Sequence, residues 1–87
     1  MDLQLQGKTA LVSGSTVGIG FAIASTLATE GATVIVNGRT QERVDEAIAR
    51  MLRESPRSTL RGAAGDLSTV EGVERVLADI PDVDILV

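Results

Sequence analysis

The sequence contains no cysteine, histidine, tryptophan or tyrosine, and its only aromatic residue is a phenylalanine. Without cysteine there is neither a disulfide framework nor a thiolate metal site, and without histidine the commonest zinc ligand and general base is missing. No apolar run approaches the roughly 20 residues that cross a bilayer. The first eight residues, MDLQLQGK, lack the basic region and apolar core of a secretory signal. We therefore expect no metal site and a cytoplasmic location.

The charge balance limits the possible partners. Eight basic residues against twelve acidic ones give a formal net charge of −4. Such a surface is unsuited to nucleic acid or to anionic lipid, which both require excess positive charge. A hydrophobic content of 44% is typical of a globular chain. The expected partner is therefore a small molecule, not a nucleic acid or a membrane.

The first half of the chain alternates between strand and helix patterns. The apolar run Lys8–Ser13 predicts a strand that is buried on both faces, and apolar residues then recur at helical spacing over 18–31. The β-branched run Thr33–Val36 predicts a second strand. Thr40 is suited to cap a second helix that ends before Pro56. The apolar face expected for that helix consists of Val44, Ala47, Ile48, Met51 and Leu52.

The second half continues the same alternation. A third strand is predicted at Thr59–Ala64, and Ser68 with Glu71 matches a capping box for a third helix that Pro81 stops. A fourth strand is predicted at Val83–Val87. The buried face expected for the third helix consists of Val70, Val73, Val76, Leu77 and Ile80. The β-α-β-α-β-α-β order with short connections predicts an α/β fold, a Rossmann-type doubly wound parallel sheet, with strand four beside strand one.

The predicted sheet is incomplete, because no helix follows the fourth strand to cover it. An apolar strand left at such an edge is prone to aggregation. We expect residues 1–87 to be a truncated, N-terminal part of a single Rossmann dinucleotide-binding domain. Taken alone, this part is expected to bind the whole cofactor weakly or not at all, because the nicotinamide pocket is absent.

The stretch Leu11–Gly20, LVSGSTVGIG, joins the first strand directly to the first helix. A helix that begins there presents free N–H groups and the positive end of its dipole, which attract anions. Gly14 is expected to allow the tight turn, Gly18 the approach of a pyrophosphate, and Gly20 close packing of the helix on the sheet. The G-x-x-x-G-x-G spacing lacks the Gly-Lys ending of a mononucleotide P-loop. A dinucleotide site is predicted.

Residues 7–20, GKTALVSGSTVGIG, resemble the opening of the short-chain dehydrogenase/reductase family, whose signature is T-G-x-x-x-G-I-G. Ser13 replaces the threonine and keeps a hydroxyl that is able to tie the turn. Residues 31–40 are similar to the family's second strand, 65–67 to its aspartate turn beside the adenine, and 84–87 to the strand leading to its N-N-A-G motif. The resemblance is to reductases related to 3-oxoacyl-carrier-protein reductase, and it implies a homo-oligomer, a tetramer or a dimer.

The resemblance also implies positions for the cofactor-binding residues. The turn 14–20 would surround the phosphates and the adenosine ribose, and Asp66 would accept a hydrogen bond from the adenine amino group, with Leu67 alongside. From the residues alone, a turn residue before Ser68 is the favoured interpretation of Asp66, and the resemblance reverses this preference. The cofactor-binding residues expected are Gly14, Ser15, Thr16, Gly18, Ile19, Gly20, Asn37, Gly38, Arg39, Asp66 and Leu67.

The end of the second strand predicts which cofactor is used. Members of this fold that prefer NAD carry an acidic residue there, which binds the ribose hydroxyls and repels a 2′-phosphate. This chain has Gly38 at that position, followed by Arg39, whose guanidinium suits a phosphate. Asn37 could add a polar contact, and Val17 stands where some NADP-preferring relatives carry a second basic residue. The pattern favours NADP over NAD. The alternative is that Arg39 is only a solvated charge in the loop.

The catalytic residues of the family cannot be assigned in this chain. The family's reaction uses a serine, a tyrosine and a lysine from a Y-x-x-x-K helix, whereas this sequence has no tyrosine and its only lysine is Lys8. The resemblance implies that the full-length protein transfers hydride between NADP(H) and a carbonyl or alcohol substrate. The alternative is a non-catalytic NAD(P)-binding regulatory module or pseudoenzyme. A receiver-like signalling domain is disfavoured because SGST, not acidic residues, follows the first strand.

Overall fold

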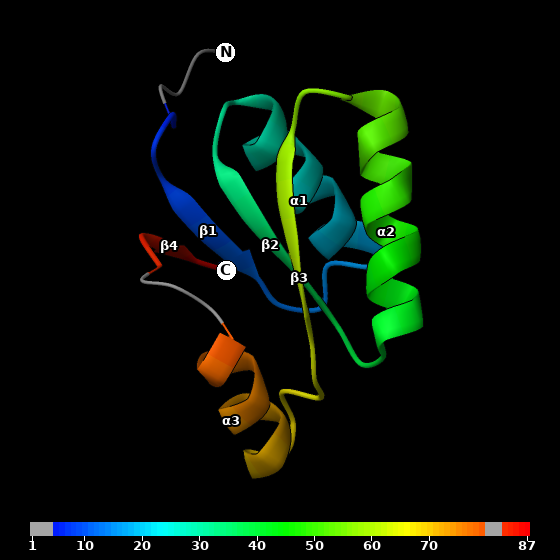
Figure 1. Ribbon diagram of the computed structural model, residues 1–87, viewed down its shortest axis with the longest axis vertical. Helices are drawn as coiled ribbons and strands as arrows, with labels where there is room; N and C mark the ends of the chain where they lie inside the picture. The colour runs from blue at the N-terminus through cyan, green and yellow to red at the C-terminus, as the bar shows by residue number, and fades with distance from the viewer. Residues whose placement is uncertain (1–4, 80–82) are drawn as a thin grey trace.

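The computed structural model describes residues 5–79 and 83–87. All strand pairs are parallel, and the four-stranded sheet has the order β3-β2-β1-β4 (Figure 1). The elements in chain order are β1 (Thr9–Val12), α1 (Gly18–Thr29), β2 (Thr33–Gly38), α2 (Gln41–Glu54), β3 (Thr59–Ala64), α3 (Val70–Asp79) and β4 (Ile85–Leu86). The predicted Rossmann-type sheet, with its fourth strand beside the first, is confirmed.

Strands β1 and β2 are buried on both faces because helices cover both sides of the sheet. Successive side chains of a strand point to opposite faces. Val34 and Val36 accordingly pack toward α1 and α2, whereas Ile35 packs toward α3. This two-sided burial explains why both strands contain continuous apolar runs.

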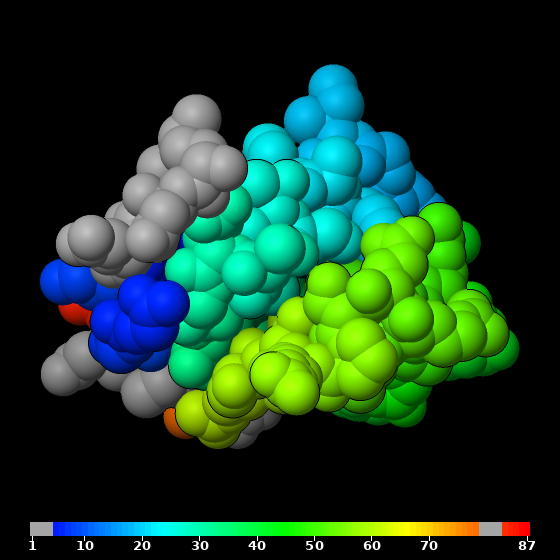
Figure 2. Space-filling model, turned by 90° about the horizontal axis from the view of Figure 1, so that it is seen from above, coloured from blue at the N-terminus to red at the C-terminus, as the bar shows by residue number. Residues whose placement is uncertain are grey.

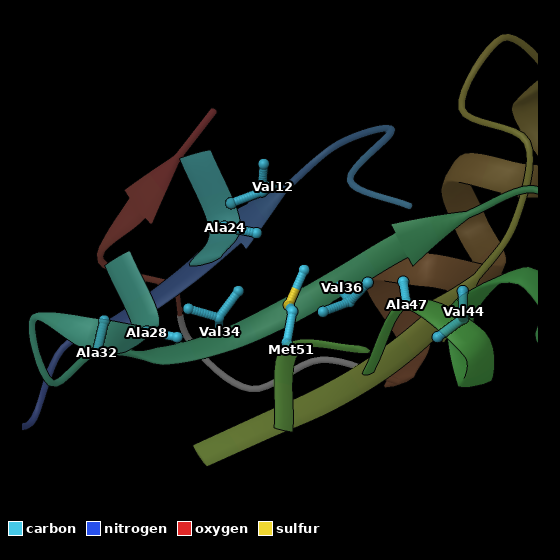
Figure 3. Close-up of a cluster of buried hydrophobic side chains, with 9 residues drawn as sticks. All are labelled: Val12, Ala24, Ala28, Ala32, Val34, Val36, Val44, Ala47 and Met51. Carbon is cyan, nitrogen blue, oxygen red and sulfur yellow. The ribbon is translucent and has the colours of Figure 1, made fainter. Parts of the chain in front are cut away.

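The main core lies between the sheet and the α1 and α2 helices (Figure 3). Small residues of α1, Ala24 and Ala28, let that helix approach the valines of the strands closely, and Met51 of α2 fills the space beside them. The buried residues of this core are Val12, Ala24, Ala28, Ala32, Val34, Val36, Val44, Ala47 and Met51. Of the face predicted for α2, Ile48 is only partly buried and Leu52 is exposed, because both lie at the margin of the contact with the sheet.

The opposite core is smaller and involves α3. Val76 packs there against Leu11, Ile35 and Ala63. The buried face predicted for α3 is wrong in part, since Val70 and Leu77 are 71% and 60% exposed and Val73 is half-buried. Ile80 and Pro81, which were expected to complete and stop this helix, lie outside the described residues.

Helices α2 and α3 both begin with a threonine cap, whose side chain accepts a hydrogen bond from the N–H three residues later. Thr40 caps α2 as predicted, because its side chain accepts a hydrogen bond from the Arg43 N–H at 3.2 Å. The cap of α3 is Thr69 and not Ser68, since Thr69 Oγ1 accepts from the Gly72 N–H at 3.0 Å. The physical reason is that α3 begins at Val70, so the residue immediately before it holds the cap position.

The two ends of the sheet carry different connections. At the amino ends of the strands, the α1–β2 and α2–β3 connections lie side by side (Figure 2), and the hydroxyl groups of Thr29 and Ser55 are 3.4 Å apart there. The connections that lead out of β1, β2 and β3 lie at the opposite, carboxyl end. Ligands of open parallel sheets bind at that end.

The Ser25 hydroxyl is buried on α1 and, within the described part of the chain, has no hydrogen-bond partner. A buried hydroxyl without a partner costs free energy, and alanine is the better helix former. We expect Ser25→Ala to raise the free energy of unfolding by about 1 kcal/mol, measured by urea denaturation. As a control, Thr26→Ala has a similar gain in helix propensity but removes an exposed hydroxyl that bonds to the Ala22 carbonyl, so it should stabilise the protein less than Ser25→Ala does. A less stable Ser25→Ala protein would contradict the prediction.

Candidate cofactor site

A cavity of about 290 Å³ lies at the carboxyl ends of β1, β2 and β3. It brings together side chains and backbone from three connections that are far apart in the sequence. The predicted residues that line it are Gly14, Thr16, Asn37, Gly38, Arg39, Asp66 and Leu67. The additional lining residues are Ser13, Val17, Arg43, Gly65 and Ser68. Ser15, Gly18, Ile19 and Gly20 are outside the lining and belong to the turn and the helix behind it.

The turn between β1 and α1 depends on its glycines. Gly14 and Gly18 have φ angles of +57° and +62°, in the left-handed region that side chains disfavour. A Cβ atom on Gly20 would collide with the carbonyl oxygen of Gly14. Gly20 therefore permits close contact with the backbone of the turn itself, which corrects the expectation of contact with the sheet.

The amino end of α1 has no side chain that compensates its dipole. Val17 occupies the cap position and makes no side-chain capping bond, and the first turn has no acidic residue. By contrast, α2 has both the Thr40 cap and Glu42 in its first turn. An anion placed at the start of α1 would supply the missing compensation.

Ser15 and Asn37 form a buried junction beneath the turn. The Asn37 N–H donates to Ser15 Oγ at 2.9 Å, and the Ser15 N–H donates to the Asn37 carbonyl at 2.8 Å. The Ser15 side chain is fully buried, so its hydroxyl faces Asn37 and not the cavity. Asn37 is 3% exposed, and its side chain bonds to three backbone groups, those of Gly14, Ala63 and Gly65.

Gly38 ends β2 at a point where no side chain fits without rearrangement. A Cβ atom there would collide with the methyl group of Thr16 and would lie 3.2 Å from Cγ2 of Val44. Thr16 thus partly fills the space that an acidic side chain at position 38 would occupy. Such a side chain would exclude a 2′-phosphate. Thr16 is therefore physically coupled to position 38, a relation that no local sequence pattern indicates.

Two arginines border the cavity beside Gly38. Arg39 follows β2 directly, and Arg43 lies in the first turn of α2. Both side chains are exposed. The sequence reasoning missed Arg43, although a signal was present: Thr40 marks a helix start immediately after Arg39, so the first turn of that helix, with Arg43, lies near the carboxyl end of β2. Arg43 thus provides a second basic side chain at this cavity, where position 17 has only a valine.

Asp66 occupies the turn after β3. Its Oδ1 accepts hydrogen bonds from the Ser68 hydroxyl at 2.6 Å and from the Ser68 N–H at 2.9 Å. These bonds lower the pKa of the Asp66 carboxyl below its usual value, and the positive charge of Arg39 lowers the pKa further. Asp66 is consequently an ionised hydrogen-bond acceptor at neutral pH, and its second oxygen is available to a ligand donor.

Ser13 acts at a different place from the one expected. Its hydroxyl donates to the carbonyl of Val87 at 2.9 Å, and its N–H bonds the same oxygen at 3.0 Å. Ser13 therefore ties the end of β1 to the end of β4 and does not tie the glycine turn. Among the described residues no acidic cluster is arranged to hold a metal ion, and no helix is long and apolar enough to cross a membrane.

Residues 8–87 match the family model described as short chain dehydrogenase. The chain belongs to this family. It is 54% identical over 87 residues to the uncharacterized oxidoreductase YvaG of Bacillus subtilis, covering 100% of this chain and 33% of that protein. It is 38% identical over 91 residues to 3-oxoacyl-[acyl-carrier-protein] reductase FabG of Aquifex aeolicus, covering 100% of this chain and 36% of that protein.

A solved structure agrees with these relatives. L-sorbose reductase from Gluconobacter frateurii, in complex with NADPH and L-sorbose, superposes with a TM-score of 0.86 and 34% identity, over 99% of this chain and 34% of that one. This chain therefore spans about a third of the length of the proteins it matches. The family comprises oxidoreductases that use a nicotinamide cofactor and act on small molecules.

Proposed function

We propose that this chain supplies the adenosine and pyrophosphate site of an NADP(H)-dependent short-chain oxidoreductase. The whole protein would transfer hydride between NADP(H) and a carbonyl or alcohol substrate. Residues 1–87 would form the N-terminal part of one Rossmann domain, with the catalytic serine, tyrosine and lysine contributed by a segment that this chain does not contain. The full-length protein would be a cytoplasmic homo-oligomer, a tetramer or a dimer.

One observation carries the choice of NADP(H): two arginines, Arg39 and Arg43, border the cavity next to Gly38, where a carboxylate would have excluded a 2′-phosphate. A guanidinium binds phosphate oxygens through charge-assisted hydrogen bonds and stays protonated at every relevant pH. The NADPH complex of L-sorbose reductase supports the same choice in a related protein.

The other residues of the site fit the remaining parts of the cofactor. The uncompensated start of α1, with glycine at positions 18 and 20, suits the pyrophosphate because a helix N-terminus favours an anion. In the described part of the chain, nothing outside its own stretch of helix lies within 4 Å of the place that a Cβ atom on Gly18 would occupy, so the backbone there is open to close approach. Asp66 would accept a hydrogen bond from the adenine amino group. When bound, the cofactor supplies the hydride chemistry, and the residues of this chain bind and orient its adenosine half.

The test uses the adenosine half of the cofactor, because this chain holds only that part of the site. The protein would be titrated with adenosine 2′,5′-bisphosphate and with 5′-AMP, while its amide resonances are followed by NMR; millimolar affinity is enough for detection. We expect shifts at Gly18, Ile19, Arg39 and Asp66, and tighter binding of the bisphosphate by about tenfold or more. Equal affinity for both ligands would contradict the choice of NADP(H), and no binding would contradict the site.

A second measurement separates the enzyme from the regulatory module or pseudoenzyme. A protein that contains this segment together with a downstream Tyr-x-x-x-Lys motif should oxidise NADPH when given a reducible carbonyl compound. If such a protein binds NADPH tightly but turns over neither carbonyl nor alcohol substrates, the non-catalytic alternative is correct.

A further inference from the structure

The Asn37 side chain joins three separate segments at the floor of the site. Its Oδ1 accepts from the Gly14 N–H at 3.0 Å, in the turn between β1 and α1. Its Nδ2 donates to the carbonyls of Ala63 at 3.0 Å and Gly65 at 3.2 Å, at the end of β3 and in the connection that follows. The Asn37 side chain therefore connects the β1–α1 turn to the segment at the end of β3.

We infer that Asn37 is a positioning residue, which holds the glycine turn and the Asp66 turn at the spacing that the adenosine half of the cofactor requires, without binding the cofactor itself. The inference rests on the proposed function, and it replaces the direct polar contact that the sequence suggested for Asn37.

The chemistry of the amide explains why this position holds asparagine. A side-chain amide offers two donors on one atom and an acceptor on the other, and Asn37 uses both sides in a buried place. Aspartate has the same shape but has no donors when ionised, so it would face the carbonyls of Ala63 and Gly65 with a negative charge. Alanine would leave the Gly14 N–H and both carbonyls without this partner.

The junction also determines which amides of the turn remain for a ligand. The Gly14 N–H bonds to Asn37 Oδ1, and the Ser15 N–H bonds to the Asn37 carbonyl. Both amides at the start of the turn are therefore already used within the protein. A bound phosphate must be met by amides that follow Ser15 in the chain, so a ligand should leave the Gly14 hydrogen bond in place.

Asn37→Asp and Asn37→Ala test the inference through ligand binding. We expect both variants to bind adenosine 2′,5′-bisphosphate and 5′-AMP about tenfold more weakly. In Asn37→Ala, which adds no charge, the ratio between the two ligands should be unchanged, because Asn37 does not contact the 2′-phosphate. The matched control is Val34→Ala, which weakens the core of the same strand and touches neither turn. A folded Val34→Ala protein should keep the affinity of the unmodified one, so a loss in the Asn37 variants is separate from lower stability.

Amide hydrogen exchange in the unmodified protein provides a measurement that does not depend on the variants folding. The Gly14 amide should exchange much more slowly than the Gly7 amide, which also has a positive φ angle but lies in an exposed turn. On addition of the bisphosphate, the Gly14 resonance should move less than those of Gly18 and Ile19.

Three results would contradict either the inference about Asn37 or the proposed function. Asn37 variants that fold and bind both ligands as tightly as the unmodified protein would overturn the inference alone. So would a Gly14 amide that exchanges as fast as that of Gly7. Failure of the unmodified protein to bind either ligand would overturn the proposed function, and with it the need for a positioning residue.

Discussion

Replacing Arg39 with alanine is expected to weaken the binding of NADPH by about ten- to a hundredfold and to leave NADH binding nearly unchanged. The estimate follows from the roughly 1.5–3 kcal/mol that a hydrogen bond to a charged group contributes. Only NADPH has the 2′-phosphate, so only NADPH loses this contact. In the full-length enzyme the change appears as a raised KM for NADPH, and in this chain as weaker binding of adenosine 2′,5′-bisphosphate relative to 5′-AMP.

Two further arginine variants show whether the effect is local. Arg43→Ala should reduce the preference for the 2′-phosphate in the same direction, because Arg43 borders the same cavity. Arg50→Ala is the matched control: Arg50 lies on the same helix, but its guanidinium stacks over Phe21 at 4.4 Å and is outside that cavity. If the unmodified enzyme uses NADH as well as NADPH at equal concentration, Arg39 does not bind a 2′-phosphate.

Gly38→Asp combined with Thr16→Ser is expected to reverse the cofactor preference toward NADH, by tenfold or more. The new carboxylate would bind the ribose hydroxyls and repel a 2′-phosphate. The second substitution is needed because a Cβ atom at position 38 collides with the Thr16 methyl group, which serine lacks. The ratio of kcat/KM for the two cofactors measures the outcome.

The single variants separate the steric effect from the charge effect. Gly38→Asp alone should bind both cofactors more weakly than the double variant, because Thr16 must leave its position to admit the new side chain. Thr16→Ser alone should keep the preference for NADPH, since it adds no charge. If Gly38→Asp alone reverses the preference with no loss of NADH affinity, Thr16 does not limit position 38.

The sequence by itself determined the layers of this protein and the place of its site. Runs such as Thr33–Val36 are too short to form a helix, and they are too apolar to form a strand with one face exposed to solvent. They therefore predict strands that are covered on both faces. The helical spacing between those runs, with short connections, leaves a parallel sheet as the natural arrangement. The glycines at positions 14, 18 and 20 then identify the turn at its carboxyl end, because few other local structures require them.

Local patterns also located helix starts, but only to within one residue. The prediction of Thr40 as a cap is confirmed, whereas the capping-box pattern predicts Ser68 and the cap is its neighbour Thr69, because both residue types are good caps. Which of two adjacent residues caps the helix depends on where the turn after the preceding strand ends. Here Ser68 is used by Asp66 two residues earlier.

Only the tertiary structure decided how residues from separate connections share the site. Asn37 bonds to Gly14 and Gly65, and Thr16 fills the space beside Gly38, although neither relation has a spacing that could be recognised along the chain. Such contacts arise where the carboxyl ends of parallel strands meet, so their partners depend on strand order and register and not on local propensity. The residue types at these positions are chosen by volume and by hydrogen-bonding capacity in three dimensions, and that information exists only once the sheet has formed.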